Sequence, residues 1–361
     1  MSRFLSNELN NLEAYVPGEQ PKDVKYIKLN TNESPYPPSP KVIEAINKLA
    51  VEGLNLYSDP DTRELTLSLA KFYSVKPEQI FVGNGSDEVL AFIFRAFFDK
   101  ERKGCFPDIT YGFYKVYAKS FGIDSNQIPL RDDFTIDINN YINCGRNIII
   151  ANPNAPTGLV LSHEEIIKIL KTNTDRVVVI DEAYVDFGSK SCIDLINSNH
   201  NLIVVQTFSK SRSLAGGRIG YAIASEEIIE DLNKIKFSFS PYNINSLSSI
   251  AGIASVKDEA YFYECNKKVI RTRERVKEEF RKLGFKVLDT KTNFVFVSHE
   301  DMAAREYHKK LRENGVLTRY YDEARIDNYV RITIGTDEEM NEVMKITEKI
   351  LIEFASLGKV I

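Results

Sequence analysis

The feature that most constrains the fold is a series of short apolar runs separated by segments with helical spacing. Four such runs occur between about residues 41 and 225: Gln79–Gly83, Asn147–Ala151, Val177–Asp181 and Leu202–Thr207. Their β-branched residues and bounding turns are typical of buried parallel strands. Asp87–Phe98 and Ser162–Lys171, which lie between these runs, show helical spacing. The sequence therefore predicts an α/β fold whose large domain holds a mostly parallel sheet flanked by helices.

Two further regions are expected on either side of this large domain. A chain of 361 residues exceeds the usual size of one core, which favours a second domain or an appendage. Six prolines in residues 1–40 indicate an extended arm that partly joins the small domain. The strand candidates Phe285–Leu288, Asn293–Ser298 and Tyr329–Gly335, with a helical Ala303–Glu313, predict a smaller α+β domain. The expected boundaries are 1–40 for the arm, 41–240 for the large domain and 241–361 for the small domain.

Composition narrows the class of function. With 47 Lys+Arg against 51 Asp+Glu, the net charge of -4 gives no electrostatic case for binding nucleic acid or an anionic membrane. The four cysteines form no CxxC pair, and the four histidines show no metal-ligand spacing with them. No apolar run of membrane-spanning length and no secretion-type start occur. We therefore expect a reduced, cytoplasmic, metal-free protein that acts on small molecules.

A lysine that follows the last of the apolar runs is the sharpest chemical signal. Lys210 lies among small hydroxyl residues and ahead of two glycines, where a parallel sheet opens its carboxyl ends to ligands. A lysine amine forms Schiff bases with carbonyl compounds once it has lost its proton. Arg218 adds a fixed positive charge eight positions further on. Taken alone, a lysine in a polar loop is more often a solvated surface residue.

Two neighbouring strands also end in polar groups. Asp181 closes an otherwise apolar run, and a buried carboxylate is costly unless a cation pairs with it. A protonated pyridine nitrogen is such a cation, although a metal-binding or capping role would fit equally well. The turn Gly83–Glu88 lies between a strand and a helix, whose free N–H groups suit a phosphate. Ser86 could equally be a plain helix N-cap.

Two other segments are weaker signals on their own. Asn152–Gly158 follows a predicted strand and could be only a proline-rich turn. Asp108–Tyr114 offers an aromatic face that could stack on a planar ring or pack in the core.

In this order, the five segments resemble fold-type I pyridoxal-phosphate aminotransferases, and more closely the histidinol-phosphate aminotransferase family. The similarity runs from about Tyr15 to Thr336 and rests on the ordered set GNGSDE, ITYGFY, NPNAPTG, VIDEAY and TFSKSRSLAGGR. It implies pyridoxal 5′-phosphate as the cofactor, an amino donor and a 2-oxo acid as substrates, and a homodimer with a shared active site.

The resemblance also implies roles for individual residues. Lys210 would carry the cofactor as a Schiff base and move the proton between the substrate Cα and the cofactor. Contacts to the cofactor ring would come from Asp181 at the pyridine nitrogen, Tyr184 at the phenolate oxygen and Tyr111 on the ring face. The cofactor phosphate would be bound by Ser86, Asp87, Ser209, Arg218 and, from the neighbouring subunit, Tyr57. The substrate would be bound by Tyr15, Arg319 and Arg331.

Two positions depart from the family pattern. Ala155 stands where most relatives have an asparagine that also bonds the ring oxygen, and alanine cannot donate that hydrogen bond. Either Asn154 reaches the ring through an altered turn, which the alternation of an extended chain makes doubtful, or Tyr184 and a water share the task. Gly217, where relatives often have leucine, should loosen the loop that leads to Arg218.

The implied reaction converts histidinol phosphate and 2-oxoglutarate to imidazole acetol phosphate and glutamate, a step of histidine biosynthesis. One pocket must then accept a phosphate and carboxylates, which suits the planar fork of Arg331 first and Arg319 second. The competing enzymes are an aromatic amino acid aminotransferase and a threonine-phosphate decarboxylase. Alternatives from other classes are a protein that only senses pyridoxal phosphate and a nucleotide-binding α/β protein; the acidic net charge disfavours the sensor.

Overall fold

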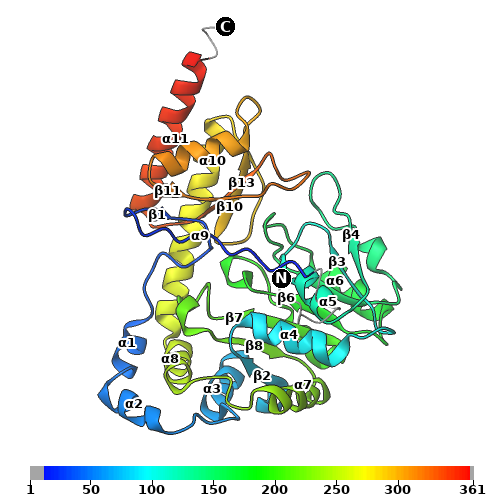
Figure 1. The fold of residues 1–361 in the computed structure, drawn as a ribbon. Helices are drawn as coiled ribbons and strands as arrows, with labels where there is room; N and C mark the ends of the chain where they lie inside the picture. Colours follow the sequence, from blue (N-terminus) through cyan, green and yellow to red (C-terminus); the bar gives the residue numbers. More distant parts are fainter. Residues whose placement is uncertain (1–11, 358–361) are drawn as a thin grey trace, which may run out of the picture.

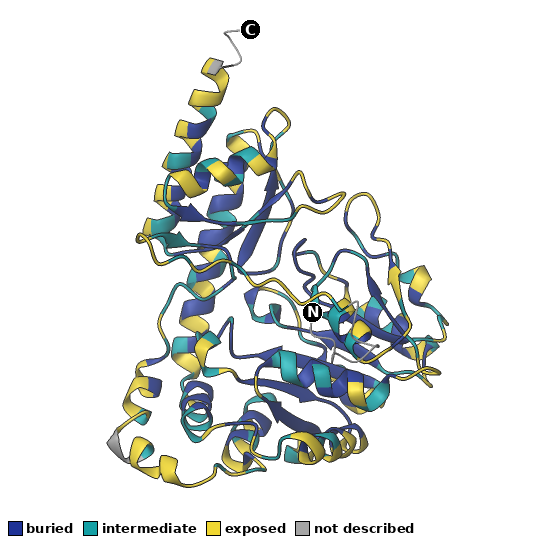
Figure 2. Ribbon diagram, viewed as in Figure 1, coloured by how far each residue is buried: buried dark blue, intermediate teal, exposed yellow. Residues whose placement is uncertain are grey.

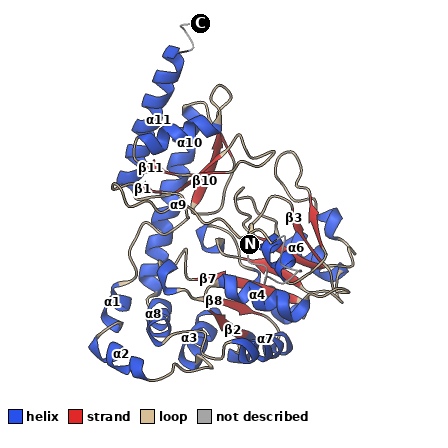
Figure 3. Cartoon of the chain, in the orientation of Figure 1, coloured by secondary structure: helices blue, strands red, loops and turns tan. Residues whose placement is uncertain are grey.

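A seven-stranded sheet forms the centre of the larger part of the molecule (Figures 1 and 3). The structure is a computed structural model that describes residues 12–357. The strands lie in the order β2 (Ile80–Gly83), β8 (Gly220–Ile223), β7 (Leu202–Thr207), β6 (Val178–Asp181), β5 (Asn147–Ala151), β3 (Gly104–Pro107) and β4 (Ser125–Ile128). Of these seven, only β8 runs against the others. The predicted α/β fold with a mostly parallel sheet is confirmed.

Helices cover both faces of this sheet because its strands direct buried apolar side chains to each face in alternation. On β5, Ile149 lies in one core cluster, whereas Ile148 and Ile150 lie in another. The first cluster includes side chains of α4 (Ser86–Phe97), α5 (Phe113–Ser120) and α7 (Glu226–Phe239). The second includes side chains of α1 (Pro40–Ala45), α3 (Arg63–Tyr73), α6 (His163–Thr172) and α8 (Ser246–Lys257). Figure 2 shows the buried strands between helices with exposed outer sides.

A smaller antiparallel sheet forms the second domain. Its strands lie in the order β12 (Arg319–Tyr320), β13 (Val330–Thr333), β10 (Phe294–Ser298) and β9 (Lys286–Val287). A third core cluster joins this sheet to α10 (Ala304–Glu313), α11 (Asp337–Leu357) and the later turns of α9 (Glu259–Lys282). The smaller α+β domain predicted from the sequence is therefore present, with strands slightly shorter than expected.

The amino-terminal segment is attached to this second domain. Strand β1 (Ile27–Lys28) pairs in parallel with β11 (Val316–Leu317). Directly after β1, Leu29, Asn30 and Asn32 are buried, with exposed fractions of 3%, 1% and 1%. In this stretch the arm packs against the second domain, and the Asn32 side chain has hydrogen-bond partners in both domains. A short helix α2 (Lys48–Glu52) follows α1.

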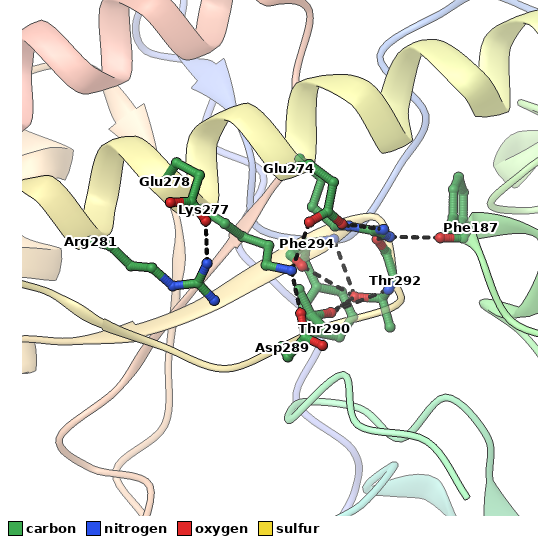
Figure 4. Close-up of polar contacts among 10 residues, drawn as sticks. Phe187, Glu274, Lys277, Glu278, Arg281, Asp289, Thr290, Thr292 and Phe294 are labelled. Carbon is green, nitrogen blue, oxygen red and sulfur yellow. Dashed lines mark hydrogen bonds and ion pairs between the residues drawn. The ribbon is translucent and has the colours of Figure 1, made fainter. Parts of the chain in front are cut away.

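Helix α9 connects the two domains, as Figure 1 shows. Its buried Arg273 donates through Nη1 to the carbonyl of Phe187 at 2.7 Å and to that of Thr292 at 2.8 Å (Figure 4). One turn further on, Lys277 bonds to Asp289 Oδ1 at 2.5 Å and to a neighbouring glutamate of the helix. Buried charges need such partners, since losing one leaves the other charge uncompensated. These contacts fix the loops ahead of β10 against the turn that follows β6.

The sequence does not predict β3, β4 or β8. β4 is short and mostly polar, and β3 is only four residues long with a glycine at its start, so neither gives a clear apolar run. Within residues 12–357, no helix has the length and apolar character needed to cross a membrane.

Candidate active site

Two adjoining cavities lie where the parallel strands of the large sheet end and the second domain begins. The smaller one, about 230 Å³, is called the inner cavity, and the larger one, about 680 Å³, the outer cavity. The two share the lining residues Thr31, Tyr111, Ala155, Tyr184 and Lys210. Carboxyl ends of parallel strands are the usual place for a ligand in such a sheet. All the residues to which the family resemblance assigns a role, except Tyr57, line one or both cavities.

Lys210 lies at the junction of the cavities, three residues after β7. Its Nζ donates to the carbonyl of Thr31 at 3.2 Å and lies 5.8 Å from the ring centre of Tyr184. Desolvation of the amine, followed by repulsion from Arg331, lowers the pKa of Lys210 to about 8. A larger share of this amine is therefore neutral near pH 7 than for an ordinary lysine, which is the form that attacks carbonyls and accepts protons.

Asp181 forms one wall of the inner cavity as the last residue of β6. Only 4% of it is exposed; Tyr114 Oη donates to its Oδ2 at 2.7 Å and the N–H of Ala183 to its Oδ1 at 3.2 Å. Burial raises the pKa of Asp181 to about 6. Within residues 12–357 no lysine, arginine or histidine forms an ion pair with it. A buried carboxylate of this kind fits a cationic ring nitrogen in the cavity.

The start of α4 also lines the inner cavity. The N-cap is Gly85, with φ of 82°, and Ser86 is the first helical residue, so the alternative that Ser86 is the N-cap is wrong. The N–H groups of the first helical turn suit an anion. Ser209 and Arg218 line the same cavity. Arg218 Nη2 bonds to Asp87 Oδ2 at 2.9 Å, which holds the guanidinium beside the helix start.

Two glycines allow the start of α4 to pack closely against β8 and Arg218. A Cβ at Gly220 would lie 2.2 Å from Ser86 N, and a Cβ at Gly85 would lie 2.4 Å from Arg218 Nη2. Any other residue at Gly220 would have to displace the backbone at the start of the helix. Gly217, by contrast, belongs to a short 3-10 turn, Ala215–Gly217, and its backbone does not have a positive φ.

Two tyrosines and Ala155 line both cavities. Tyr111 Oη donates to Asp87 Oδ1 at 2.7 Å, and Tyr184 Oη accepts from Asn32 Nδ2 at 2.9 Å. The side chain of Asn154 is used elsewhere: its Nδ2 donates to the carbonyl of Ile109 at 3.0 Å, and its Oδ1 accepts from a threonine. All of these contacts are with the protein, and Asn154 does not line either cavity. This agrees with the expectation that side-chain alternation along the chain directs Asn154 away from the ring.

The outer cavity contains the three residues expected to meet the substrate. Arg331 Nη2 donates to the carbonyl of Asn30 at 3.0 Å, whereas its buried Nε has no hydrogen-bond partner in the structure. Arg319 Nη2 donates to the carbonyl of Val16 at 3.3 Å. The two guanidinium groups lie 5.5 and 5.8 Å from the ring centre of Tyr321. Tyr15 stacks on Phe113, with ring centres 4.2 Å apart.

Tyr57 is the one predicted site residue that the structure does not bring to the cavities. It is 83% exposed and stacks on Tyr242, with ring centres 4.5 Å apart. Tyr57 therefore does not contribute to the active site of its own subunit.

Sequence reasoning missed four residues of the site: Thr31, Asn32, Tyr114 and Tyr321. A signal existed for Tyr114, because it lies three positions after Tyr111 and so on the same side of a helical turn. No periodic pattern marks Thr31 and Asn32, which lie in a proline-rich segment and meet the site only through tertiary contacts.

The residues present fit pyridoxal phosphate. The buried carboxylate of Asp181 suits a protonated pyridine nitrogen, and the free N–H groups at the helix start at Ser86, in the same cavity, suit a phosphate. Lys210 lines the same cavity, where its amine would be available to the aldehyde carbon of the cofactor.

Comparisons with known proteins decide the family. The family model described as aminotransferase class I and II matches residues 24–346. The chain belongs to the class I and II aminotransferase family. This aminotransferase is 52% identical over 342 residues to a histidinol-phosphate aminotransferase of Brachyspira hyodysenteriae, with 94% of this chain and 97% of the relative covered. It is 51% identical to one of Clostridium acetobutylicum, with 95% and 98% covered.

A solved structure of an aminotransferase has the same fold as this chain. The histidinol-phosphate aminotransferase of Sinorhizobium meliloti, in complex with pyridoxal 5′-phosphate, has a TM-score of 0.83 and 25% identity, with 90% of this chain and 92% of that chain covered. The aminotransferase is thus a fold-type I transaminase that depends on pyridoxal phosphate and acts on an amino donor and a 2-oxo acid.

Proposed function

We propose that this enzyme transfers the amino group of histidinol phosphate to 2-oxoglutarate. The names of relatives at about half identity over nearly the whole chain support this donor. The observation that carries the proposal is the pair Arg319 and Arg331 in the cavity that also contains Lys210. The donor has a phosphate and the acceptor has carboxylates, and a planar guanidinium can bind either in a bidentate manner.

When bound, pyridoxal phosphate supplies an electron sink for the charge that develops when the Cα–H bond of the donor breaks. Lys210 is the residue we assign to hold the cofactor covalently and to take the proton from this Cα. Lys210 lines both cavities, which supports a position between cofactor and substrate. Its pKa of about 8 leaves part of the amine neutral for the proton transfer near neutral pH.

Other residues of the inner cavity hold and orient the cofactor in this proposal. Asp181 pairs with the ring nitrogen, and Tyr114 keeps the carboxylate in place through its hydrogen bond. Tyr184 donates to the ring oxygen, and Tyr111 packs on the ring face. The phosphate is bound by Ser86, Asp87, Ser209 and Arg218, whose N–H, O–H and guanidinium groups line one end of the cavity.

Arg331 binds the anionic group of the substrate nearest Lys210 in this scheme. Its buried Nε has no partner among residues 12–357, so a donor is free for a ligand. Arg319 and Tyr15 close the outer part of the cavity, where Arg319 already bonds to the arm at Val16. Contact between Arg319 and the arm that contains Tyr15 would exclude water from the reacting atoms.

A homodimer completes the proposed site. Tyr57 is almost fully exposed and lies in a stretch with other exposed apolar residues, Val51, Leu54 and Leu56. Such clusters often mark protein interfaces. We assign Tyr57 of the partner subunit to the cofactor phosphate. We also propose a cytoplasmic location, because all four cysteines are free thiols.

The donor can be identified by a half-reaction screen. The enzyme loaded with pyridoxal phosphate is mixed with one candidate donor at a time, without a 2-oxo acid, and the loss of the visible cofactor absorbance is followed. Histidinol phosphate should react with the highest kcat/KM, ahead of phenylalanine, tyrosine and threonine phosphate. Faster reaction with an aromatic amino acid, or release of carbon dioxide from threonine phosphate, would replace the proposal with the corresponding alternative enzyme.

A further inference from the structure

Asn32 connects both domains at the edge of the site. Its side-chain Nδ2 donates to Tyr184 Oη at 2.9 Å, in the turn after β6. Its Oδ1 accepts from Thr333 Oγ1 at 3.0 Å, on β13, and its backbone N–H donates to the same oxygen at 3.0 Å. Asn293 Nδ2 in turn donates to the carbonyl of Asn32 at 3.0 Å. The carboxamide is thus held in one orientation, with its nitrogen toward Tyr184.

The backbone at Asn32 also limits which residue can stand there. Its φ is 56°, in the left-handed region, where asparagine and aspartate are several-fold enriched among residues other than glycine. With 1% of its surface exposed, it is also fully enclosed. Both its backbone and its side chain are therefore fixed.

We propose that Asn32 is a positioning residue for transamination: its amide donates to Tyr184 Oη and so directs the hydroxyl hydrogen of Tyr184 into the inner cavity. A carboxamide nitrogen can only donate, so Tyr184 Oη must be the acceptor in this contact. The phenol then has one hydrogen left to give, and within residues 12–357 no group accepts it. A hydroxyl that accepts one hydrogen bond is also polarised to donate another more strongly.

This arrangement explains how the site can lack an asparagine at Ala155. In relatives, by resemblance, that asparagine donates directly to the cofactor ring oxygen. Here an amide acts on the same oxygen through Tyr184, from a different segment of the chain. The inference rests on the proposed contact between Tyr184 and the ring oxygen.

Charged groups around Tyr184 come from several elements. Asp181 on β6 and Asp87 on α4 disfavour loss of the phenolic proton, whereas Arg331 on β13 favours it. Lys210 lies 5.8 Å from the ring centre. Burial is the largest influence and raises the pKa of Tyr184, so the phenol keeps its hydrogen at neutral pH. It is therefore available as a donor.

The test is a pH titration of the visible absorbance of the loaded enzyme. Tyr184→Phe removes a donor from the ring oxygen, which then holds the proton of the Lys210–cofactor link more tightly. The pH midpoint of this absorbance titration should rise by about one unit. Asn32→Asp retains size and tolerates the left-handed backbone, but its carboxylate accepts the hydrogen of Tyr184 and turns it away from the cavity. It should raise the midpoint by a similar amount.

The double variant separates a hydrogen-bond effect from a charge effect. Asn32→Asp combined with Tyr184→Phe should have the same midpoint as Tyr184→Phe alone, because no phenolic hydrogen is left to redirect. If the effect of Asn32→Asp persists in the Tyr184→Phe background, or is absent with Tyr184 intact, the inference is wrong. If Tyr184→Phe itself leaves the midpoint unchanged, the assigned contact of Tyr184 fails instead, and the donor screen still stands.

A second variant covers the case that Asn32→Asp does not retain the cofactor. Thr333→Val removes the hydroxyl that orients the carboxamide and should shift the midpoint upward by less than Tyr184→Phe does. Thr347→Val is its matched control, since Thr347 is equally buried in the same domain and bonds to Tyr307 Oη at 2.8 Å, away from the cavities. Equal midpoints for the two threonine variants would overturn the inference.

Discussion

At the scale of single residues, the site is a set of buried charges whose partners lie far apart in the chain. The sequence predicts Lys210, Asp181 and the start of α4 because each lies at or within three residues of the end of a recognisable apolar strand. It does not predict that Tyr114 bonds to Asp181 or that Asn32 bonds to Tyr184, since these pairs are 67 and 152 positions apart. Side-chain pairs of this separation depend on how the domains pack, which local pattern does not report.

Asp181→Asn tests the cost of burying this carboxylate. The pKa of Asp181 is about 6 when folded against 3.8 for the free side chain, so its contribution favours folding at low pH and is lost as pH rises through 6. Between pH 5 and pH 8 the cofactor-free wild type should lose ~1.5 kcal/mol of stability relative to Asp181→Asn. Urea unfolding of both proteins at the two pH values measures this difference.

The loaded enzyme is the control for that prediction. A protonated ring nitrogen beside Asp181 stabilises the carboxylate, so saturating pyridoxal phosphate should abolish most of the pH-dependent difference. An unchanged difference with and without cofactor would mean that Asp181 does not meet the ring.

At the scale of elements, the sequence predicts those with continuous apolar runs best. β5 and β7 have the predicted bounds, because both are fully buried and rich in β-branched residues. β3 and β4 are missed because each is only four residues long and contains few apolar residues. The close approach of β8 to α4 is also not predictable, because it depends on a glycine whose neighbour lies more than a hundred positions away in the chain.

Gly220→Ala tests this approach. The new Cβ would lie 2.2 Å from Ser86 N and would push the start of α4 away from the cavity. Overpacking of this kind costs ~1–3 kcal/mol, so cofactor binding should weaken by roughly 10- to 100-fold. The affinity can be measured by titrating the cofactor-free protein with pyridoxal phosphate.

Gly216→Ala is the matched control, because no atom lies within 4 Å of its added Cβ and its φ is not positive. It should bind the cofactor with nearly wild-type affinity. Equal affinities for both alanine variants would show that the start of α4 does not hold the phosphate.

At the scale of the whole molecule, a single subunit supplies all but one of the residues expected at the site. The two cavities lie between the domains, and one expected group, Tyr57, lies on the surface instead. The family resemblance predicts that this residue serves a neighbouring subunit, whereas composition and periodicity give no sign of it. The packing of the segment around Asn32 against the second domain is likewise a property of the complete fold.

Hybrid dimers test the shared site. Tyr57→Ala and Lys210→Ala homodimers should each have low activity. A hybrid of the two contains one site with both Lys210 and Tyr57 intact, so it should recover about half of the wild-type activity per dimer. Differently tagged subunits, refolded together and purified as hybrids, allow the measurement. Activity that stays at the mean of the two parent homodimers would contradict a site shared between subunits.

The most direct test of the account is the position of the cofactor on the chain. Loaded enzyme is reduced with borohydride, digested and mapped by mass spectrometry. If Lys210 binds the cofactor, one modified peptide with the pyridoxyl group on Lys210 is expected, together with loss of the visible absorbance on reduction. A pyridoxyl group on any other lysine, or no stable modification at all, would contradict it.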